Sequence, residues 1–404
     1  MPLMSMPNEL LVLICESFEG DQQSLKNLSL TCSRFANAAK PTLFHRLACS
    51  YDEGSALINF LASHTHIPPL VKDIAFAAIP NRDSMAPSPH FTFIEDNKAV
   101  QFINATLEVK PWTMFDGQII GSTAEFAQAY SNMWVCFRET FLVHMLPRLK
   151  EVNFGGRMMH APMLWKDLQL AETKTVSNMV LCRYFSHSEI NDVAHCFPNI
   201  EKLSVVVQQD PLAAPHDPPS PFIFEHLTSF HLVANNLGSD HLQGVLGSMP
   251  ALREFGFEIA GPHGSMSPLQ ISTDVSAMCG GGLRTLKLNL EALDTTVFDD
   301  DELSMSFADM TSLERIYLHG GTTIYGTDFD IGANVNQAPV RPLRVQTLFP
   351  PNIVDVAISV CDAATYDAYD RELGQLETLK ERYFARIEKL WLRLTADSHG
   401  FHPL

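Results

Sequence analysis

A short apolar pattern, apolar-x-x-apolar-x-apolar, recurs along the chain and constrains its fold more than any other feature. Its last positions alternate, as in a strand whose every second side chain points into a core. It begins at Val71, Leu149, Val176, Ile200, Leu227, Leu252, Leu283, Leu313, Ile353 and Ile387. From residue 149 onward the starts lie 24 to 40 residues apart, a spacing that suits stacked repeats of one helix and one short strand.

Prolines mark four of these repeats. A proline stands two residues before the first apolar position at Pro147, Pro198, Pro250 and Pro351. Because proline cannot continue a helix, it marks the point where a helix gives way to the next strand. Short helices are predicted at 191–197, 240–249 and 274–279, and a longer one at 366–386. The residues that begin at Ile387 are predicted to form the last strand.

Four segments depart from the repeat and are predicted to be insertions. Prolines and small polar residues crowd 80–89 and 210–221, and glycine, threonine and asparagine are frequent in 320–342. Such composition is typical of loops, because proline excludes both helix and strand interiors. The fourth segment, 98–146, is rich in aromatic residues, and its second half is predicted to be helical.

Composition indicates a folded protein and excludes some partners. Hydrophobic residues make up 46% of the chain and charged residues 18%, as in globular proteins. The net charge of −18 argues against nucleic acid or an anionic membrane as the main partner. The 404 residues allow a large core, in two units.

The cysteines indicate a reducing compartment. All eight are scattered and none forms a C-x-x-C pair, so free and mostly buried thiols are expected. Neither a secretory signal at Met1 nor an apolar run long enough to span a membrane is found in the sequence. These features predict a cytoplasmic or nuclear protein.

Residues capable of catalysis or metal binding are few, and none forms a recognisable site. His64 and His66 lie close in sequence, but no H-E-x-x-H motif or paired C-x-x-C accompanies them. The glycines at 280–282 lack the Lys-Ser/Thr ending of a phosphate loop and are interpreted as a turn. The acidic run 299–302 is typical of a solvated loop. We therefore expect no catalytic residue, no metal and no cofactor.

The first 45 residues contain three short apolar segments that are too small to form a confident independent domain. Pro7 and Glu9 suit the first turn of a helix, and Leu10, Leu11, Ile14 and Phe18 are predicted to form one apolar stripe on it. Gly20 and Asp21 would end this helix, with Asp21 capping the next one. A second stripe follows at Leu25, Leu28 and Cys32. Pro41 is expected to break the chain before Leu43 and Phe44, which would fold back and close the module.

This N-terminal pattern resembles an F-box. That module typically opens with Leu/Met-Pro-x-Glu-Leu-Leu-x-x-Ile, here residues 6–14. It continues with Leu-x-x-Leu-x-Leu-(Val/Thr)-Cys-x-x-Phe, here 25–35, and ends near Pro-x-Leu-Phe, here 41–44. With the irregular repeats that follow, the chain resembles fungal F-box proteins with degenerate leucine-rich repeats.

The resemblance implies an α/β architecture in three parts. Residues 1–48 would form the helical F-box, 49–146 a linking region with the first repeat and the aromatic-rich insertion, and 147–404 an irregular leucine-rich-repeat solenoid of helices and short parallel strands. It also implies a substrate-recognition subunit of an SCF-type ubiquitin ligase. Such a subunit binds a Skp-type adaptor, and through it a cullin, and is not itself an enzyme.

The resemblance assigns adaptor contacts but no target residues. The expected contacts are Pro7, Glu9, Leu10, Leu11, Ile14, Leu28, Cys32, Phe35, Leu43 and Phe44. The target, a protein, would bind the strand face or the loops after each strand. Two alternatives stay open: a scaffold that binds the adaptor but delivers no target, and a ligand-binding protein or enzyme on an irregular α/β fold.

Overall fold

The chain has a mixed α/β fold that divides into two compact units. A computed structural model describes residues 6–49, 54–76, 101, 104–105, 112–113, 119–122, 124–125, 134–154, 175–182, 193–194, 196–207, 223–234, 237–261, 266–293, 297–298, 302, 305–320, 348–360 and 386–394. Unit 1 comprises Met1–Arg183 and His195–Asn199, and unit 2 comprises Tyr184–Ala194 and Ile200–Leu404.

Unit 1 begins with three helices, α1 (Asn8–Glu16), α2 (Gln22–Ser29) and α3 (Ser33–Leu43). A parallel ladder follows, formed in chain order by β1 (Arg46–Cys49), β2 (Asp73–Phe76), β5 (Glu151–Phe154) and β6 (Asn178–Cys182). Helices α4 (Gly54–Ser63) and α7 (Trp134–Met145) and the 3-10 helix Pro68–Leu70 lie between strands in the sequence. Two short strands, β3 (Trp112–Thr113) and β4 (Ile119–Ile120), form a separate antiparallel pair.

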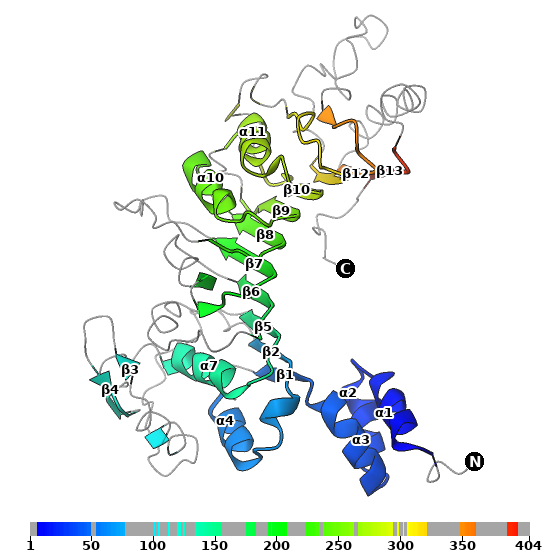
Figure 1. The fold of residues 1–404 in the computed structure, drawn as a ribbon, viewed down its shortest axis with the longest axis vertical. Helices are drawn as coiled ribbons and strands as arrows, with labels where there is room; N and C mark the ends of the chain where they lie inside the picture. Colours follow the sequence, from blue (N-terminus) through cyan, green and yellow to red (C-terminus); the bar gives the residue numbers. More distant parts are fainter. Residues whose placement is uncertain are drawn as a thin grey trace, which may run out of the picture. The chain divides into compact units, whose positions relative to one another are not determined.

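Unit 2 is likewise built from parallel strands that follow one another in chain order. Its parallel strands are β7 (Lys202–Val207), β8 (Ser229–Ala234), β9 (Glu254–Ile259), β10 (Thr285–Asn289), β11 (Arg315–His319), β12 (Asp355–Val360) and β13 (Lys389–Leu394), again in chain order. Helices α10 (Ser239–Gly247) and α11 (Pro268–Cys279) connect successive strands and lie on one side of the ladder (Figure 1). The outward side chains of the strands therefore form a second face.

The repeated apolar pattern predicted strands correctly. All ten starts are followed, two residues later, by a parallel strand, from Val71 before β2 to Ile387 before β13. The first apolar residue is buried in every case, because it anchors the turn beneath the strand. One strand was missed: β1 follows the same pattern, with Phe44, Leu47 and Cys49 at the apolar positions.

A common turn leads into the strands. The carbonyl of the residue before one strand accepts two successive N–H groups from the next strand's entry, as His45 does from Lys72 and Asp73. Arg284 accepts in the same way from Glu314 and Arg315. The two bonds fix the register of each parallel pair, since backbone donors at buried positions require partners. The similarity of this turn in both units shows that they are built from one kind of repeat.

The predicted helices are confirmed in part. The helix at 240–249 corresponds to α10, and the helical second half of 98–146 corresponds to α7. Pro147, Pro198, Pro250 and Pro351 all lie in turns before strands, as expected. The helix at 274–279 was predicted too short. It begins at Pro268, because the Ser267 hydroxyl oxygen accepts the Gln270 N–H at 3.2 Å and so caps the helix.

Other predictions lie wholly or largely outside the described residues. These are the helix at 366–386, of which only Arg386 is described, in a turn, and the insertions at 80–89, 210–221 and 320–342, of which only Gly320 is described. At 191–197, residues 193–194 and 196 are helical. The glycines at 280–282 form a turn before β10, as predicted.

Phenylalanine side chains fill the core of unit 2. Phe230 and Phe255 are fully buried on neighbouring strands, and their rings stack with centroids 5.9 Å apart. Unit 2 also buries a carboxylate, that of Asp274. Asp274 on α11 accepts hydrogen bonds from Ser239 and Gln243 of α10 and from Gln270, so its desolvation is offset by three donors.

Gly320 occupies a position that only glycine fits. Its φ angle is +99°, and a Cβ there would lie 2.8 Å from the backbone nitrogen of Glu291. We expect Gly320→Ala to lower the free energy of unfolding by about 2 kcal/mol, measured by chemical denaturation. The matched control is Gly281→Ala, since a Cβ there meets nothing within 4 Å. Equal losses in the two variants would contradict this account.

Candidate functional site

Helices α1 to α3 form a small module whose boundaries follow from local sequence. Pro7 precedes α1, where its missing N–H costs nothing. Gly20, with a φ angle of +97°, turns the chain after α1, and Asp21 then accepts the Ser24 N–H at 3.0 Å and caps α2. Hydrogen bonds with the Ser24 side chain and with its backbone N–H lower the pKa of the Asp21 carboxyl. The predicted capping role of Asp21 is confirmed. The prediction that Gly20 and Asp21 end the first helix was wrong, because α1 ends at Glu16 with Ser17 as its C-terminal cap residue.

The prediction for Pro41 was wrong. Pro41 lies inside the last turn of α3 and does not break the chain. A proline so near the helix end removes a single backbone hydrogen bond, and the helix closes normally beyond it. Phe44 N–H donates to Lys40 and His45 N–H donates to Thr42. Leu43 is therefore helical and Phe44 is the C-terminal cap residue.

The module has its own apolar core. Its buried members come from all three helices and are Leu11, Cys15, Leu25, Phe35, Ala38 and Ala39. Met6, Val12, Phe18, Leu28, Cys32 and Leu43 are partly buried against them. Small residues on α3 let the helices approach closely, and Leu11 retains only 1% of its accessible surface. This core connects all three helices.

A set of leucines remains outside that core. Leu10 is 46% exposed, Leu13 58% and Leu30 76%. Arg34, near the start of α3, donates to the Met6 carbonyl at 2.6 Å and to Asn8 Oδ1 at 2.7 Å, so the start of α3 lies beside the start of α1. Leu30 stands three residues before α3. We call Leu10, Leu13 and Leu30 the exposed leucine set.

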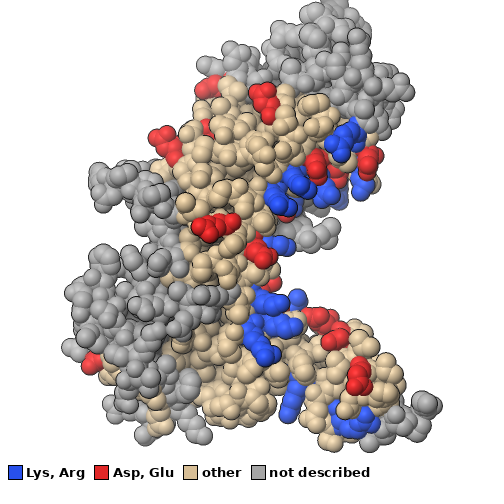
Figure 2. Space-filling view, in the orientation of Figure 1, with Lys and Arg blue, Asp and Glu red and all other residues tan. Residues whose placement is uncertain are grey.

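Charged side chains on the module are scattered, with uncharged surface between them (Figure 2). Scattered single apolar residues are normal on protein surfaces, but several large ones on a module of this size indicate an interaction surface. Leucine side chains gain free energy when a partner removes them from water. The arrangement can bind an apolar protein surface and carries no catalytic group.

The ten residues predicted as adaptor contacts separate into three groups. Pro7, Glu9 and Leu10 are exposed; Ile14, Leu28, Cys32, Leu43 and Phe44 are partly buried; Leu11 and Phe35 are buried in the core. The prediction that Leu10 and Leu11 share one stripe was wrong, because only Leu11 faces α2 and α3. Leu11 and Phe35 therefore support the module from inside. Sequence reasoning missed Leu13 and Leu30 as surface residues.

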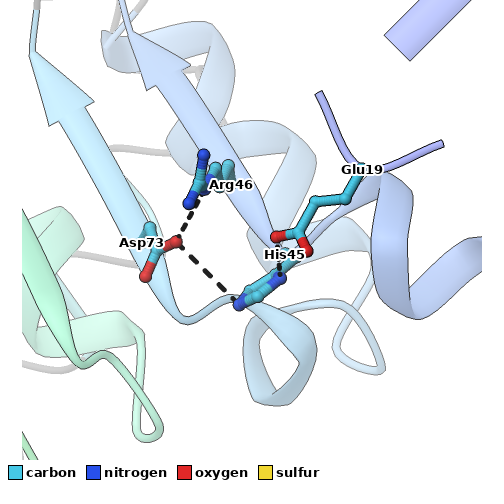
Figure 3. A network of polar contacts seen from close by, with 4 residues as sticks. All are labelled: Glu19, His45, Arg46 and Asp73. Carbon is cyan, nitrogen blue, oxygen red and sulfur yellow. Dashed lines mark hydrogen bonds and ion pairs between the residues drawn. The ribbon is translucent and has the colours of Figure 1, made fainter. Parts of the chain in front are cut away.

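A polar network joins the end of α1 to the first strands within unit 1 (Figure 3). His45 Nδ1 lies 3.2 Å from Glu19 Oε1, and His45 Nε2 lies 3.9 Å from Asp73 Oδ2. Arg46 Nε donates to the same Asp73 oxygen at 3.0 Å, which raises the pKa of Arg46. Surface pairs of this kind contribute about 0–1 kcal/mol each. The contacts connect the turn after α1 to β1 and β2.

The remaining described residues suggest no reactive site. No group of three His, Cys, Asp or Glu side chains within them is arranged to hold a metal ion. His64 stacks on Phe60 with ring centroids 4.6 Å apart and lies edge-on to His66. Among the helices in the described ranges, none has the length and apolar character needed to cross a bilayer.

The described cysteines differ in accessibility. Burial raises the pKa of Cys279 to about 12, and burial and Glu16 raise the pKa of Cys15, whereas Cys32 is partly exposed. Since the thiolate is the reactive form, we expect iodoacetamide at neutral pH to label Cys32 and spare Cys15 and Cys279 in the native chain. Peptide mass spectrometry measures this. Equal labelling of all three thiols would contradict the structure.

No family model matches the chain, and no curated protein matches it. The function is therefore inferred from the residues and geometry of the chain itself.

Proposed function

We propose that the chain is the substrate-recognition subunit of an SCF-type ubiquitin ligase. In this proposal the helical module binds a Skp-type adaptor, and the repeat strands bind a protein target. The observation that carries the proposal is the exposed leucine set on a three-helix module whose sequence resembles an F-box. The parallel strands that follow supply a separate surface for the target.

The proposed mechanism is proximity. The adaptor connects the chain to a cullin and to the enzyme that transfers ubiquitin, so the chain needs no catalytic group. Holding the target near that enzyme converts an encounter between two free molecules into a reaction within one complex. The network of Glu19, His45, Arg46 and Asp73 is consistent with this role, because it connects the module to the first strands.

The adaptor surface in this proposal is smaller than the set expected from sequence. Leu10, Leu13 and Leu30 would be its apolar centre, with Pro7 and Glu9 beside them on α1. Interface centres are dominated by a few well-packed side chains. Replacing Leu10 and Leu30 by aspartate would place two charges in that centre, where they would be desolvated without partners.

The test is co-expression with a Skp-type adaptor, followed by size-exclusion chromatography. We expect a one-to-one complex with the wild type and none with the Leu10→Asp/Leu30→Asp variant. The matched control is Gln22→Asp/Asn37→Asp, which adds the same charge at exposed polar positions of the module. This control is expected to bind like the wild type.

Circular dichroism of each variant establishes that it is folded. A folded wild type that elutes apart from the adaptor would overturn the proposal. Loss of the complex in the control would show that added charge, and not removal of the leucines, is responsible. The chain could also bind the adaptor while protein turnover stays unchanged in cells that lack the chain. That result would favour the scaffold alternative.

A further inference from the structure

The outward face of the last three strands has a distinct composition. The register places Arg315 beside Asp355 and Asp355 beside Lys389. The next outward row contains Tyr317, Ala357 and Trp391. The last row contains His319, Ser359 and Arg393, of which His319 and Ser359 are buried. Inward positions such as Ile316, Val356 and Ile358 are buried. We call the outward residues Arg315, Tyr317, Asp355, Ala357, Lys389, Trp391 and Arg393 the cationic strand face.

Trp391 is the principal apolar feature of this face. Its side chain is 62% exposed, although tryptophan is usually well buried. Ala357 separates Trp391 from Tyr317 in the register, so the two aromatic residues stand two strands apart, about 10 Å. An exposed tryptophan between basic neighbours is typical of a residue that a partner covers, because aromatic side chains with Arg are enriched at interface centres.

The cations around Trp391 have no ionic partners among the described residues. No ion pair joins Arg315, Lys389 or Arg393 to a carboxylate within 4 Å in that part of the chain. Asp355, the one carboxylate on these three strands' outward face, accepts the Tyr317 hydroxyl at 3.3 Å. Lys287 on β10 differs from these cations, since it pairs with Glu254 at 2.7 Å.

The face therefore carries positive charge on an acidic protein. Three cationic side chains stand against one carboxylate, whereas the whole chain has a net charge of −18. The turns directly before these strands add one cation, Arg386, and two carboxylates, Glu314 and Glu388, so the excess of positive charge lies on the strands themselves. Figure 2 shows Lys and Arg side chains gathered, with some acidic ones, where Figure 1 draws β10 to β13.

We propose that the cationic strand face binds an acidic peptide segment of a partner protein, with an apolar side chain of that segment covering Trp391. The positive charge of the face and the negative charge of such a segment are complementary. Carboxylates of the segment would pair with Arg315, Lys389 and Arg393, and such charge-assisted hydrogen bonds are the stronger ones. The remaining negative charge of the chain would repel acidic segments from other surfaces and so favour this one.

This inference deepens the proposed function, since it names the chemical class of the target. Its binding step can nevertheless be measured without the adaptor. Because Lys389 and Arg393 flank Trp391 at two-residue spacing, their side chains point to the same side of the strand. An extended acidic segment could meet all three residues along one strand.

The test uses fluorescence anisotropy with the full chain and a short fluorescein-labelled peptide in which Asp and Glu surround a central Leu. A second peptide replaces the acidic residues by Lys and Arg. We expect the acidic peptide to bind at low salt at least tenfold more tightly than the basic one. Its affinity should fall as salt is raised, because screening weakens exposed ion pairs.

Two variants and a matched control identify the face. Lys389→Glu/Arg393→Glu is expected to weaken binding of the acidic peptide at least tenfold, and Trp391→Ala about tenfold. The control Lys202→Glu/Arg253→Glu makes the same charge change at exposed positions on and before other strands of unit 2. It should change the affinity by less than about threefold.

Equal binding of both peptides would overturn the inference, as would equal weakening by the control. Circular dichroism confirms the fold of each variant, and adaptor co-elution separates this inference from the proposed function. If the chain binds the adaptor but not the acidic peptide, the inference about the cationic strand face is overturned and the proposed function stands. A chain that binds the peptide at this face without binding the adaptor removes only the ligase proposal.

Discussion

Replacing Phe255 by alanine is expected to lower the free energy of unfolding of unit 2 by about 3–5 kcal/mol. Phe255 is fully buried on β9, and its ring stacks on Phe230 of β8 and lies near Phe257. Removing the ring leaves a cavity that neighbouring strands cannot fill, because each strand is fixed in register by the turn before it. Chemical denaturation followed by circular dichroism measures the loss.

The matched variant is Phe255→Leu, which keeps most of the buried volume. We expect it to cost about 1–1.5 kcal/mol. The effect should spread to the adjacent repeats, since repeat proteins are stabilised mainly by contacts between neighbours. If Phe255→Ala and Phe255→Leu unfolded at the same denaturant concentration as the wild type, the stacked phenylalanine core would be wrong.

Leu11→Ala and Leu10→Ala are expected to have opposite consequences although the two residues are adjacent. Leu11 is buried among the three helices, so its truncation should destabilise the module by about 2–5 kcal/mol. Leu10 is 46% exposed, so its truncation should change stability by less than about 0.5 kcal/mol. Under the proposed function, Leu10→Ala should instead weaken adaptor binding by about 2 kcal/mol or more.

Hydrogen exchange of peptides covering 8–43 measures the stability of the module directly, and titration with the adaptor measures affinity. In Leu11→Ala, exchange should accelerate throughout α1 to α3. In Leu10→Ala it should remain that of the wild type while affinity falls. Acceleration by both variants, or by neither, would contradict the assignment of Leu11 to the core and Leu10 to the surface.

The strands were predictable because each copy of the apolar pattern marks both where the strand begins and which of its side chains face the core. Each start supplies a buried anchor, and the alternating residues that follow have one side facing the core, as Leu286 and Leu288 do on β10. The missed strand β1 carries the same signal, but the F-box-like pattern places Phe44 at the end of the helical module. Phe44 belongs to both, as the cap of α3 and the start of the first repeat.

The extent of α11 is also predictable from the sequence. Ser267 is followed by Pro268 and Gln270, a combination typical of a helix start. In the structure, the Ser267 side chain caps the helix and Pro268 is its first residue. The earlier turn of α11 also carries Gln270, one of the three donors to buried Asp274.

The surface of the helical module was not predictable from periodicity. Residues 10–15 are all apolar, so two different stripes fit the same helix equally well. The packing of α2 and α3 decides between them. Leu25 and Phe35 meet Leu11 and Cys15, which leaves Leu10 and Leu13 outside. The pairing of outward residues on β11 to β13 likewise depends on register between repeats that are far apart in sequence.

Calorimetric titration of the purified full chain with a Skp-type adaptor tests the central claim most directly. The account predicts one-to-one binding with a dissociation constant in the micromolar range or tighter, and no measurable heat for the folded Leu10→Asp/Leu30→Asp variant. The Gln22→Asp/Asn37→Asp control should bind like the wild type. A folded wild type that releases no heat with the adaptor, or a leucine variant that binds equally well, would contradict the account.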